Sequence, residues 1–221
     1  MLKASAIIVA GGSGVRMGRP KQMLPINGKA VLARSVEAFK KTPLVKEIIV
    51  VTTAENFAKL SRKYKGLIYA EPGPSRIESL KSGLAKVNSA FKLVAVHDGA
   101  RPLVSPKAVK ACLESANKNK AAVLAVAVKD TIKEVKGDKV VRTLDRSVLY
   151  AAQTPQCYQT KILQDALKKY GKYKDATDES QLVEKLGVKV AVVLSSYDNI
   201  KITTPEDLII AEALCKSKKK K

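Results

Sequence analysis

The chain has 221 residues, of which 46% are hydrophobic, and its 41 lysines and arginines against 20 aspartates and glutamates give a formal net charge of +21. This length and apolar content suit one domain of the α/β class with its own core. The sequence has neither a secretory leader nor an apolar run of the roughly 18–20 residues that a membrane helix needs, so we expect a cytoplasmic protein without a membrane partner.

Cysteine and histidine content restricts the possible metal chemistry. The three cysteines, Cys112, Cys157 and Cys215, are odd in number and widely spaced, and His97 is the single histidine. This pattern excludes a disulfide framework, a C-x-x-C metal site and a site built from several histidines. We therefore expect reduced thiols and no redox-metal chemistry.

The excess positive charge raises nucleic-acid binding as an alternative function. Aromatic residues make up only 5% of the chain and tryptophan is absent, so few side chains can stack on bases. We expect no specific nucleic-acid binding, and interpret the lysines either as a solubilising surface or as a field that gathers phosphorylated small molecules. Retention of nucleic acid at physiological salt would favour the alternative, a basic binding protein.

Apolar runs of strand length alternate with amphipathic segments through the first half of the chain. The apolar runs cover residues 6–10, 47–52, 93–97 and 121–128. The amphipathic segments cover residues 31–41, 55–65, 75–87 and 105–118. The alternation predicts a mostly parallel, twisted, Rossmann-like sheet flanked by helices, with ligands at the carboxyl ends of the strands.

The second half of the chain has a different pattern. A turn at 136–138 separates two short strands with polar flanks and predicts a β-hairpin. The hairpin has too few apolar residues to form a core by itself, so it either packs on a partner subunit or is disordered in solution. Helices are expected at 160–169, 178–186 and from Thr204 onwards, with a strand at 188–194. We thus expect a single domain over 1–221, with a β-arm at about 130–152 and a disordered lysine-rich tail at about 216–221.

A glycine-rich loop, AGGSGVRMGRPK, follows the first apolar run from Ala10 to Lys21. Its glycines allow the backbone to approach a bulky anion and to point N–H groups at it. The dinucleotide fingerprint G-x-G-x-x-G fails because Met17 stands at the third glycine position, and the P-loop motif has no match. Arg16 and Lys21 supply two cations where a polyphosphate would lie; a merely flexible turn is the alternative.

The segment HDGARP places a carboxylate, Asp98, at the end of the third apolar run. One carboxylate opposite a phosphate-binding loop suits Mg²⁺, which takes its other ligands from phosphate and water. The alternative is an aspartate that only caps a turn. Because neighbouring strand residues point to opposite faces, His97 does not act together with Asp98, and we interpret it as structural.

Six motifs, in this order along the chain, resemble one known family. They are AGGSGVRMG…PKQ, HDGARP, Asp145-Arg146, QTPQ at 153–156, Thr177-Asp178-Glu179, and DNIKIT at 198–203 followed by Pro205-Glu206-Asp207. Together they resemble the 2-C-methyl-D-erythritol 4-phosphate cytidylyltransferases of the non-mevalonate isoprenoid pathway, over nearly the whole chain from Ala4 to about Leu214. The resemblance implies a nucleotidyltransferase fold and a homodimer in which the arm is exchanged.

The implied reaction transfers CMP from CTP to methylerythritol phosphate, releasing pyrophosphate with the help of Mg²⁺. The attacking phosphate is already an anion, so catalysis consists of positioning and charge stabilisation. The resemblance implies catalytic roles for Arg16, Lys21, Arg146 and Lys201 and a metal ligand at Asp98. It implies nucleotide binding by Ala10, Gly11, Gly12, Gly73 and Ser79, and substrate binding by Arg101, Thr131, Thr154 and Thr177.

The sequence departs from the family pattern at the nucleotide loops. Pro72 replaces the first of two usual glycines, Pro74 stands at an often acidic position, and Gly11 stands where alanine is common. Ribitol-5-phosphate cytidylyltransferase is the alternative within the same class, although Ala100 in HDGARP favours the methylerythritol enzyme. A comparison of turnover with the two phosphates would separate these alternatives.

Overall fold

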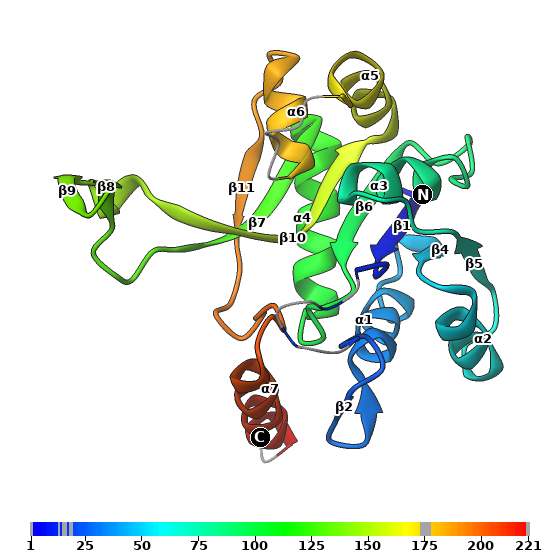
Figure 1. Cartoon of the computed structure of the whole chain (residues 1–221). Helices are drawn as coiled ribbons and strands as arrows, with labels where there is room; N and C mark the ends of the chain where they lie inside the picture. Colours follow the sequence, from blue (N-terminus) through cyan, green and yellow to red (C-terminus); the bar gives the residue numbers. More distant parts are fainter. Residues whose placement is uncertain (1, 13, 15–16, 18–19, 173–177, 220–221) are drawn as a thin grey trace.

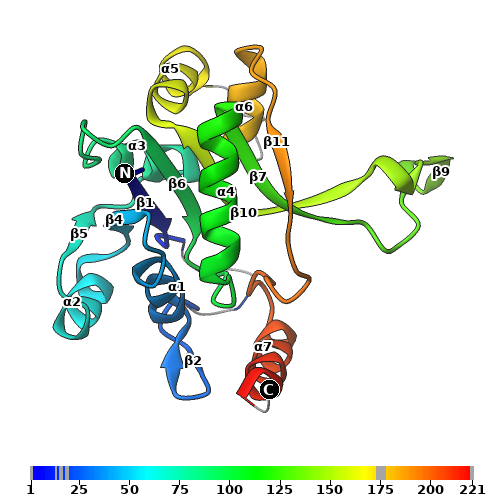
Figure 2. The ribbon, with the colours of Figure 1, turned by 180° about the vertical axis from the view of Figure 1, so that it is seen from behind.

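The computed structural model describes residues 2–12, 14, 17, 20–172 and 178–219. A seven-stranded sheet in the order β11-β7-β10-β6-β1-β4-β5 forms its centre, with helices on both faces (Figure 1 and, from behind, Figure 2). The strands are β1 (Ala4–Val9), β2 (Pro25–Ile26), β3 (Lys29–Ala30), β4 (Val45–Val51), β5 (Leu67–Ala70), β6 (Leu93–Asp98), β7 (Ala121–Ala127), β8 (Lys133–Lys136), β9 (Lys139–Thr143), β10 (Tyr150–Gln159) and β11 (Ala191–Leu194). The helices are α1 (Val31–Lys40), α2 (Ala54–Lys63), α3 (Arg76–Leu84), α4 (Pro106–Asn119), the 3₁₀ turn η2 (Arg146–Val148), α5 (Thr160–Tyr170), α6 (Glu179–Lys185) and α7 (Pro205–Lys219).

Burial on both faces explains why the central strands are continuously apolar. β1 pairs in parallel with β4 and with β6. Its side chains alternate between two cores: Ala6 and Ile8 pack with α1, α2 and α4, whereas Ile7 packs with α3, α5 and α6. This arrangement confirms the predicted mostly parallel α/β sheet.

β10 corrects the expected boundary of the arm. It lies between β6 and β7 and is antiparallel to both, and its first residues Tyr150 to Ala152 pair with residues 125–127 of β7. Residues 150–152 therefore belong to the main sheet and not to the arm. β10 joins the sheet because pairing with β6 and β7 gives its backbone N–H and C=O groups hydrogen-bond partners, whereas in an isolated hairpin many of these groups would bond only to water.

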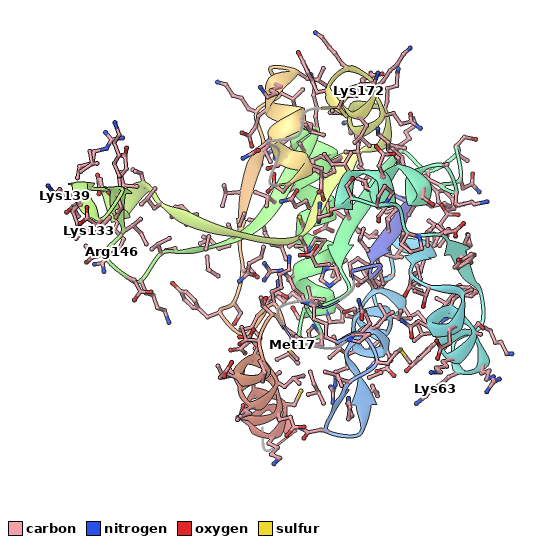
Figure 3. The ribbon with its side chains drawn as sticks, viewed as in Figure 1. Met17, Lys63, Lys133, Lys139, Arg146 and Lys172 are labelled. Atoms are coloured by element: carbon pink, nitrogen blue, oxygen red, sulfur yellow. The ribbon has the colours of Figure 1, made fainter. Side chains whose placement is uncertain are left out.

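The arm projects from the sheet as a separate two-stranded hairpin made of β8 and β9 (Figure 3). Gly137 has φ 63° in its turn, a backbone conformation that suits glycine. Every residue of β8 and β9 is exposed, and Val140 and Val141 are 60% and 56% exposed. The hairpin thus has no core among the described residues of its own chain.

α7 reaches into the segment that was expected to be a disordered tail. The helix continues to Lys219, so positions 216–219 are helical; lysine is a good helix former and extends the preceding turn at little cost. Ala211 and Cys215 of α7 pack with Met17, Ile26, Val31 and Ile202 in a third small core. Within the described ranges, no helix is both long enough and apolar enough to cross a lipid bilayer.

Candidate active site

The carboxyl edge of the sheet holds a cavity of about 450 Å³ between the loops that follow β1, β5 and β6. Its size suits a small organic ligand, for which pockets of roughly 300–1,000 Å³ are usual. The predicted site residues that line it are Ala10, Gly11, Gly12, Lys21, Gly73, Ser79, Asp98 and Lys201. The structure therefore brings together, at one edge, residues that are up to about 190 positions apart in the chain.

A second cavity, of about 230 Å³, adjoins the first on the side of β10. Of the predicted substrate residues, Arg101 and Thr154 line it. Arg76, Asp98 and Lys201 line both cavities. The arrangement offers two neighbouring binding volumes with one charged cluster between them.

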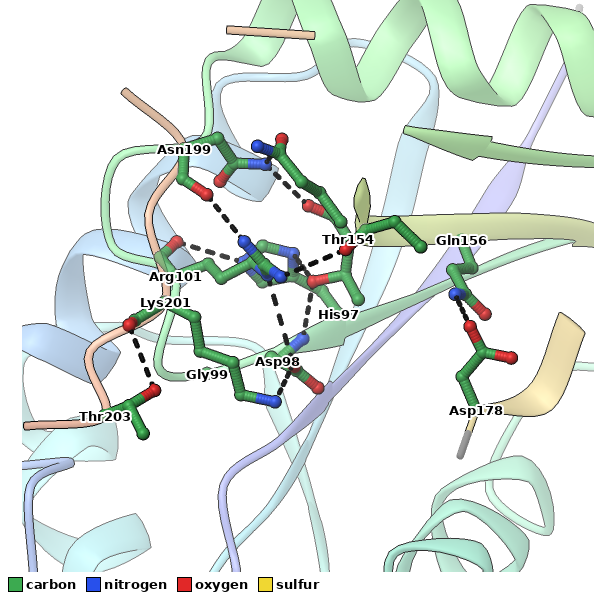
Figure 4. Close-up of polar contacts among 12 residues, drawn as sticks. His97, Asp98, Gly99, Arg101, Thr154, Gln156, Asp178, Asn199, Lys201 and Thr203 are labelled. Carbon is green, nitrogen blue, oxygen red and sulfur yellow. Dashed lines mark hydrogen bonds and ion pairs between the residues drawn. The ribbon is translucent and has the colours of Figure 1, made fainter. Parts of the chain in front are cut away.

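Asp98 is the centre of this charged cluster, and Figure 4 shows it with Lys201 and Arg101. Its Oδ2 lies 2.7 Å from Lys201 Nζ and 4.0 Å from Arg101 Nε, and its Oδ1 accepts a hydrogen bond of 3.1 Å from Arg76 Nη2. Burial alone would raise the pKa of Asp98, but Arg76 and Lys201 outweigh it and hold that pKa well below its usual range. The carboxylate therefore stays charged at the floor of the site.

Arg76 was not predicted as a site residue, yet it connects the two sides of the cluster. Ser75 caps α3 by accepting a hydrogen bond from the Glu78 N–H, which places Arg76 in the first turn at the cavity edge. Its guanidinium binds both Asp98 and the fully buried carboxylate of Glu179 at the start of α6. Burial opposes the charge of Arg76, but Glu179 and Asp98 raise its pKa. The S-x-x-E capping box at 75–78 marks the start of α3 in the sequence, and this signal could have placed Arg76 in the first turn of that helix.

His97 has a structural role, as its position on β6 predicts. Asp98 N–H donates to Thr154 Oγ1, the Thr154 hydroxyl donates to His97 Nδ1, and His97 Nε2–H donates to the Arg101 carbonyl. This chain of bonds fixes the neutral imidazole, and burial lowers the pKa of His97 to about 4. Neither ring nitrogen is left to accept a proton from a substrate.

Arg101 fixes the loop that carries Lys201. Its Nη1 donates to the Asn199 carbonyl at 2.7 Å, and its Nη2 donates to the Ala152 carbonyl at 3.4 Å. Asn199 in turn donates from Nδ2 to Gln153 Oε1 and to the Thr154 carbonyl, both at 2.9 Å. The segment 198–201 is thereby attached to β10, which sets where Lys201 enters the site.

The glycine-rich loop is anchored by a buried amide. Gln22, which is 4% exposed, donates from its side-chain Nε2 to the Gly12 carbonyl, and its backbone carbonyl accepts from the Leu32 N–H at 2.9 Å. Lys21 lines the cavity beside it. Arg16, to which the family resemblance gives a catalytic role, lies outside the described residues.

Two more predicted residues, Arg146 and Thr131, are absent from the described linings of the two cavities. Arg146 lies on the arm, where its Nη1 binds the Lys129 carbonyl (Figure 3). Thr177 lies outside the described residues. On the substrate side, Asp178 accepts a 2.7 Å hydrogen bond from Gln156 Nε2 and caps α6, two contacts that the sequence did not predict.

Comparison with known proteins identifies the family. Residues 4–217 match the family described as IspD, 2-C-methyl-D-erythritol 4-phosphate cytidylyltransferase. The chain belongs to this family. It is 45% identical over 222 residues to the cytidylyltransferase of that name from Endomicrobium trichonymphae, covering 98% of this chain and 100% of the relative. It is 39% identical over 229 residues to the one from Halalkalibacterium halodurans, covering 100% of both.

Solved structures of cytidylyltransferases in this family share the fold. The crystal structure of 4-diphosphocytidyl-2C-methyl-D-erythritol synthase from Anaerococcus prevotii superimposes with a TM-score of 0.87 and 34% identity, covering 97% of this chain and 96% of that one. The crystal structure from Thermus thermophilus gives a TM-score of 0.81 with 32% identity, covering 98% and 100%. The family resemblance of the six sequence motifs is thereby confirmed.

Proposed function

We propose that the chain transfers a cytidylyl group from CTP to 2-C-methyl-D-erythritol 4-phosphate, giving 4-diphosphocytidyl-2-C-methyl-D-erythritol and pyrophosphate in isoprenoid precursor synthesis. A phosphate oxygen of methylerythritol phosphate bonds to the α-phosphorus of CTP as the bond to the β-phosphate oxygen breaks. Family membership supports this substrate over ribitol 5-phosphate. The observation that best supports placing the reaction at this site is the cluster of Asp98 with Arg76, Arg101 and Lys201 between two cavities.

The residues of the site suit a reaction that needs positive charge and no general base. We assign the larger cavity to CTP, with the glycine loop and Lys21 at the triphosphate, and the smaller one to methylerythritol phosphate. Lys201 lines both cavities and so faces the attacking phosphate and the α-phosphate together. Cations fixed before reaction stabilise the charge that develops on the leaving pyrophosphate.

The chemistry of Asp98 fits a divalent cation such as Mg²⁺. It is one deprotonated carboxylate that faces the proposed triphosphate cavity. Among the described residues no group of three or more histidine, cysteine and acidic side chains lies together, so phosphate oxygens and water would supply the other ligands. When bound, Mg²⁺ neutralises charge on the triphosphate.

We also propose that the chain works as a homodimer in the cytoplasm, with the arm reaching a second copy. The exposed valines of β8 and β9 have no partner surface among the described residues of their own chain, and Arg146 and Thr131 lie outside its cavities. Burial of these valines against the partner would bring both residues to the partner's site.

Pyrophosphate release tests the reaction. The complete mixture contains the protein, Mg²⁺, CTP and methylerythritol phosphate, and each component is omitted in turn. We expect release only from the complete mixture, a phosphorus NMR signal of the new diphosphate ester, and little release with ribitol 5-phosphate. Asp98→Asn, which keeps the shape but not the charge of the carboxylate, is expected to raise the Mg²⁺ concentration needed for half-maximal release. Release with ribitol 5-phosphate as fast as with methylerythritol phosphate would contradict the proposal.

A further inference from the structure

Two loops that both line the larger cavity touch each other at Gly11 and Pro72. Gly11 follows β1 and Pro72 follows β5. A Cβ atom added to Gly11 would lie 2.2 Å from Pro72 Cβ, 3.2 Å from its Cγ and 3.5 Å from its Cα. Carbon atoms in contact prefer roughly 3.5–4.0 Å, and a proline ring has no rotamer that moves it aside. The contact therefore exists only because residue 11 has no side chain.

The strand ends below this contact are cross-linked. β4 lies between β1 and β5 in the sheet, so Pro72 reaches across the end of β4 to meet Gly11. Thr52, just after β4, donates from its N–H to the Ala70 carbonyl at 3.2 Å and from its hydroxyl to the Ala10 carbonyl at 3.3 Å. The backbone on either side of the contact is therefore held in place.

The loop that carries Pro72 is fixed on its other side as well. Gly73 N–H donates to Ser79 Oγ at 3.0 Å, and the Ser79 hydroxyl lies 3.3 Å from the Gly73 carbonyl. A Cβ on Gly73 would lie 2.5 Å from Glu78 Cβ, so the loop already rests on α3. The backbone next to Pro72 is therefore held against α3, which limits how far the ring can shift if residue 11 gains a side chain.

We propose that Pro72 is a positioning residue for the nucleotide and that Gly11 and Pro72 act as one pair. The proline ring resting on Gly11 sets the distance between the first loop and the wall formed by Gly73 and Ser79. That distance sets the width of the slot into which the pyrimidine base of a nucleoside triphosphate inserts. The inference rests on the proposed function, because it places CTP in this cavity.

A double-substitution experiment tests the pair. Gly11→Ala is expected to raise the KM for CTP about tenfold or more with a smaller change in kcat, because the methyl group forces the walls apart. Pro72→Gly removes the ring and leaves its Cα 3.5 Å from the new methyl, which is ordinary contact, so Gly11→Ala combined with Pro72→Gly should recover the KM of Pro72→Gly alone. Pro72→Ala keeps the Cβ at 2.2 Å, so its combination with Gly11→Ala should stay impaired.

The comparison between glycine and alanine at position 72 distinguishes a steric clash between residues 11 and 72 from a general loss of loop rigidity. Equal rescue by Pro72→Ala and Pro72→Gly, or an unchanged KM in Gly11→Ala, would overturn the proposal. If Gly11→Ala alone does not fold, the melting temperatures of the two double variants decide, and only the one with glycine at position 72 is expected to recover. CTP binding and turnover by the unsubstituted protein are measured alongside the variants, the binding by calorimetry. CTP binding without turnover would contradict the proposed function. Normal turnover of the unsubstituted protein, with no recovery in the double variant that has glycine at position 72, would contradict the proposed pairing of Gly11 with Pro72.

Discussion

The carboxyl edge of the sheet and the arm differ in how their charges and apolar groups are satisfied. At the edge, Asp98 and Glu179 are buried and share Arg76. On the arm, Arg142 pairs with Glu134 in full contact with water, and the valines beside them are exposed. The buried charges at the sheet edge find their partners within the chain, whereas the valines of the arm are exposed to solvent. The difference supports two of our proposals: that the cavity assigned to CTP is preorganised within each chain, and that the arm packs on a second copy.

The buried ion pair is expected to give the largest effect. Arg76→Leu takes the cation away from the buried Glu179 carboxylate and removes one of the cations around Asp98. We therefore expect a loss of about 3–5 kcal/mol in the free energy of unfolding, measured by urea denaturation. Arg142→Leu is the matched control on the arm, where an exposed pair contributes about 0–1 kcal/mol. Equal losses in the two variants would remove the distinction between the regions.

Lys21→Ala tests the charge that the glycine loop brings to the cavity. We expect kcat to fall by about 10²–10³-fold with the thermal unfolding midpoint unchanged, because a cation that stabilises the transition state is lost. Lys63→Ala, on the exposed face of α2, is the control and should keep normal turnover. Near-normal kcat in Lys21→Ala would contradict the assignment of the triphosphate to this cavity.

The buried imidazole makes the stability of the sheet edge depend on pH. Folding lowers the pKa of His97 from 6.5 to about 4, so the unfolded chain binds a proton that the folded chain excludes between these values. The contribution of neutral His97 to the free energy of unfolding is complete above pH 6.5 and is lost as the pH falls toward 4. The total loss is about 3 kcal/mol. Urea unfolding at several pH values measures it. In His97→Gln, the dependence of the unfolding free energy on pH between 4 and 6.5 should become smaller. An unchanged dependence would show that other groups cause it.

Mixing two inactive variants tests the arm. If Arg146 serves the neighbouring chain, a mixed dimer of Lys21→Ala and Arg146→Ala has one site with both residues intact. Random association would then restore about a quarter of the normal activity, since about half of the dimers are mixed and half of their sites are complete. The measurement is pyrophosphate release after the chains exchange, with mixed dimers verified by mass spectrometry. No recovery in verified mixed dimers would show that each site is built from one chain.

Local patterns predicted the parallel part of the fold and missed β10. The apolar runs at 6–10, 47–52 and 93–97 became β1, β4 and β6, because strands buried on both faces must be continuously apolar. β10 has the sequence YAAQTPQCYQ, which lacks both continuity and clean alternation. Its place between β6 and β7 is decided by pairing with strands more than 20 residues away in sequence, which no local pattern reports.

The sequence by itself determined the α/β class, the glycine loop, the carboxylate at the end of β6 and, through six ordered motifs, the family. Each strand, helix and motif pattern depends on residue type and spacing within a short segment, and the order of these segments along the chain gives the class and the family. Only the tertiary structure decided that Arg76 joins Asp98 to Glu179, that residues 150–152 leave the arm for the sheet, and that Gly11 meets Pro72. Contacts of this kind depend on how strand ends and helix starts meet in space, and the order of residues along the chain does not contain those distances.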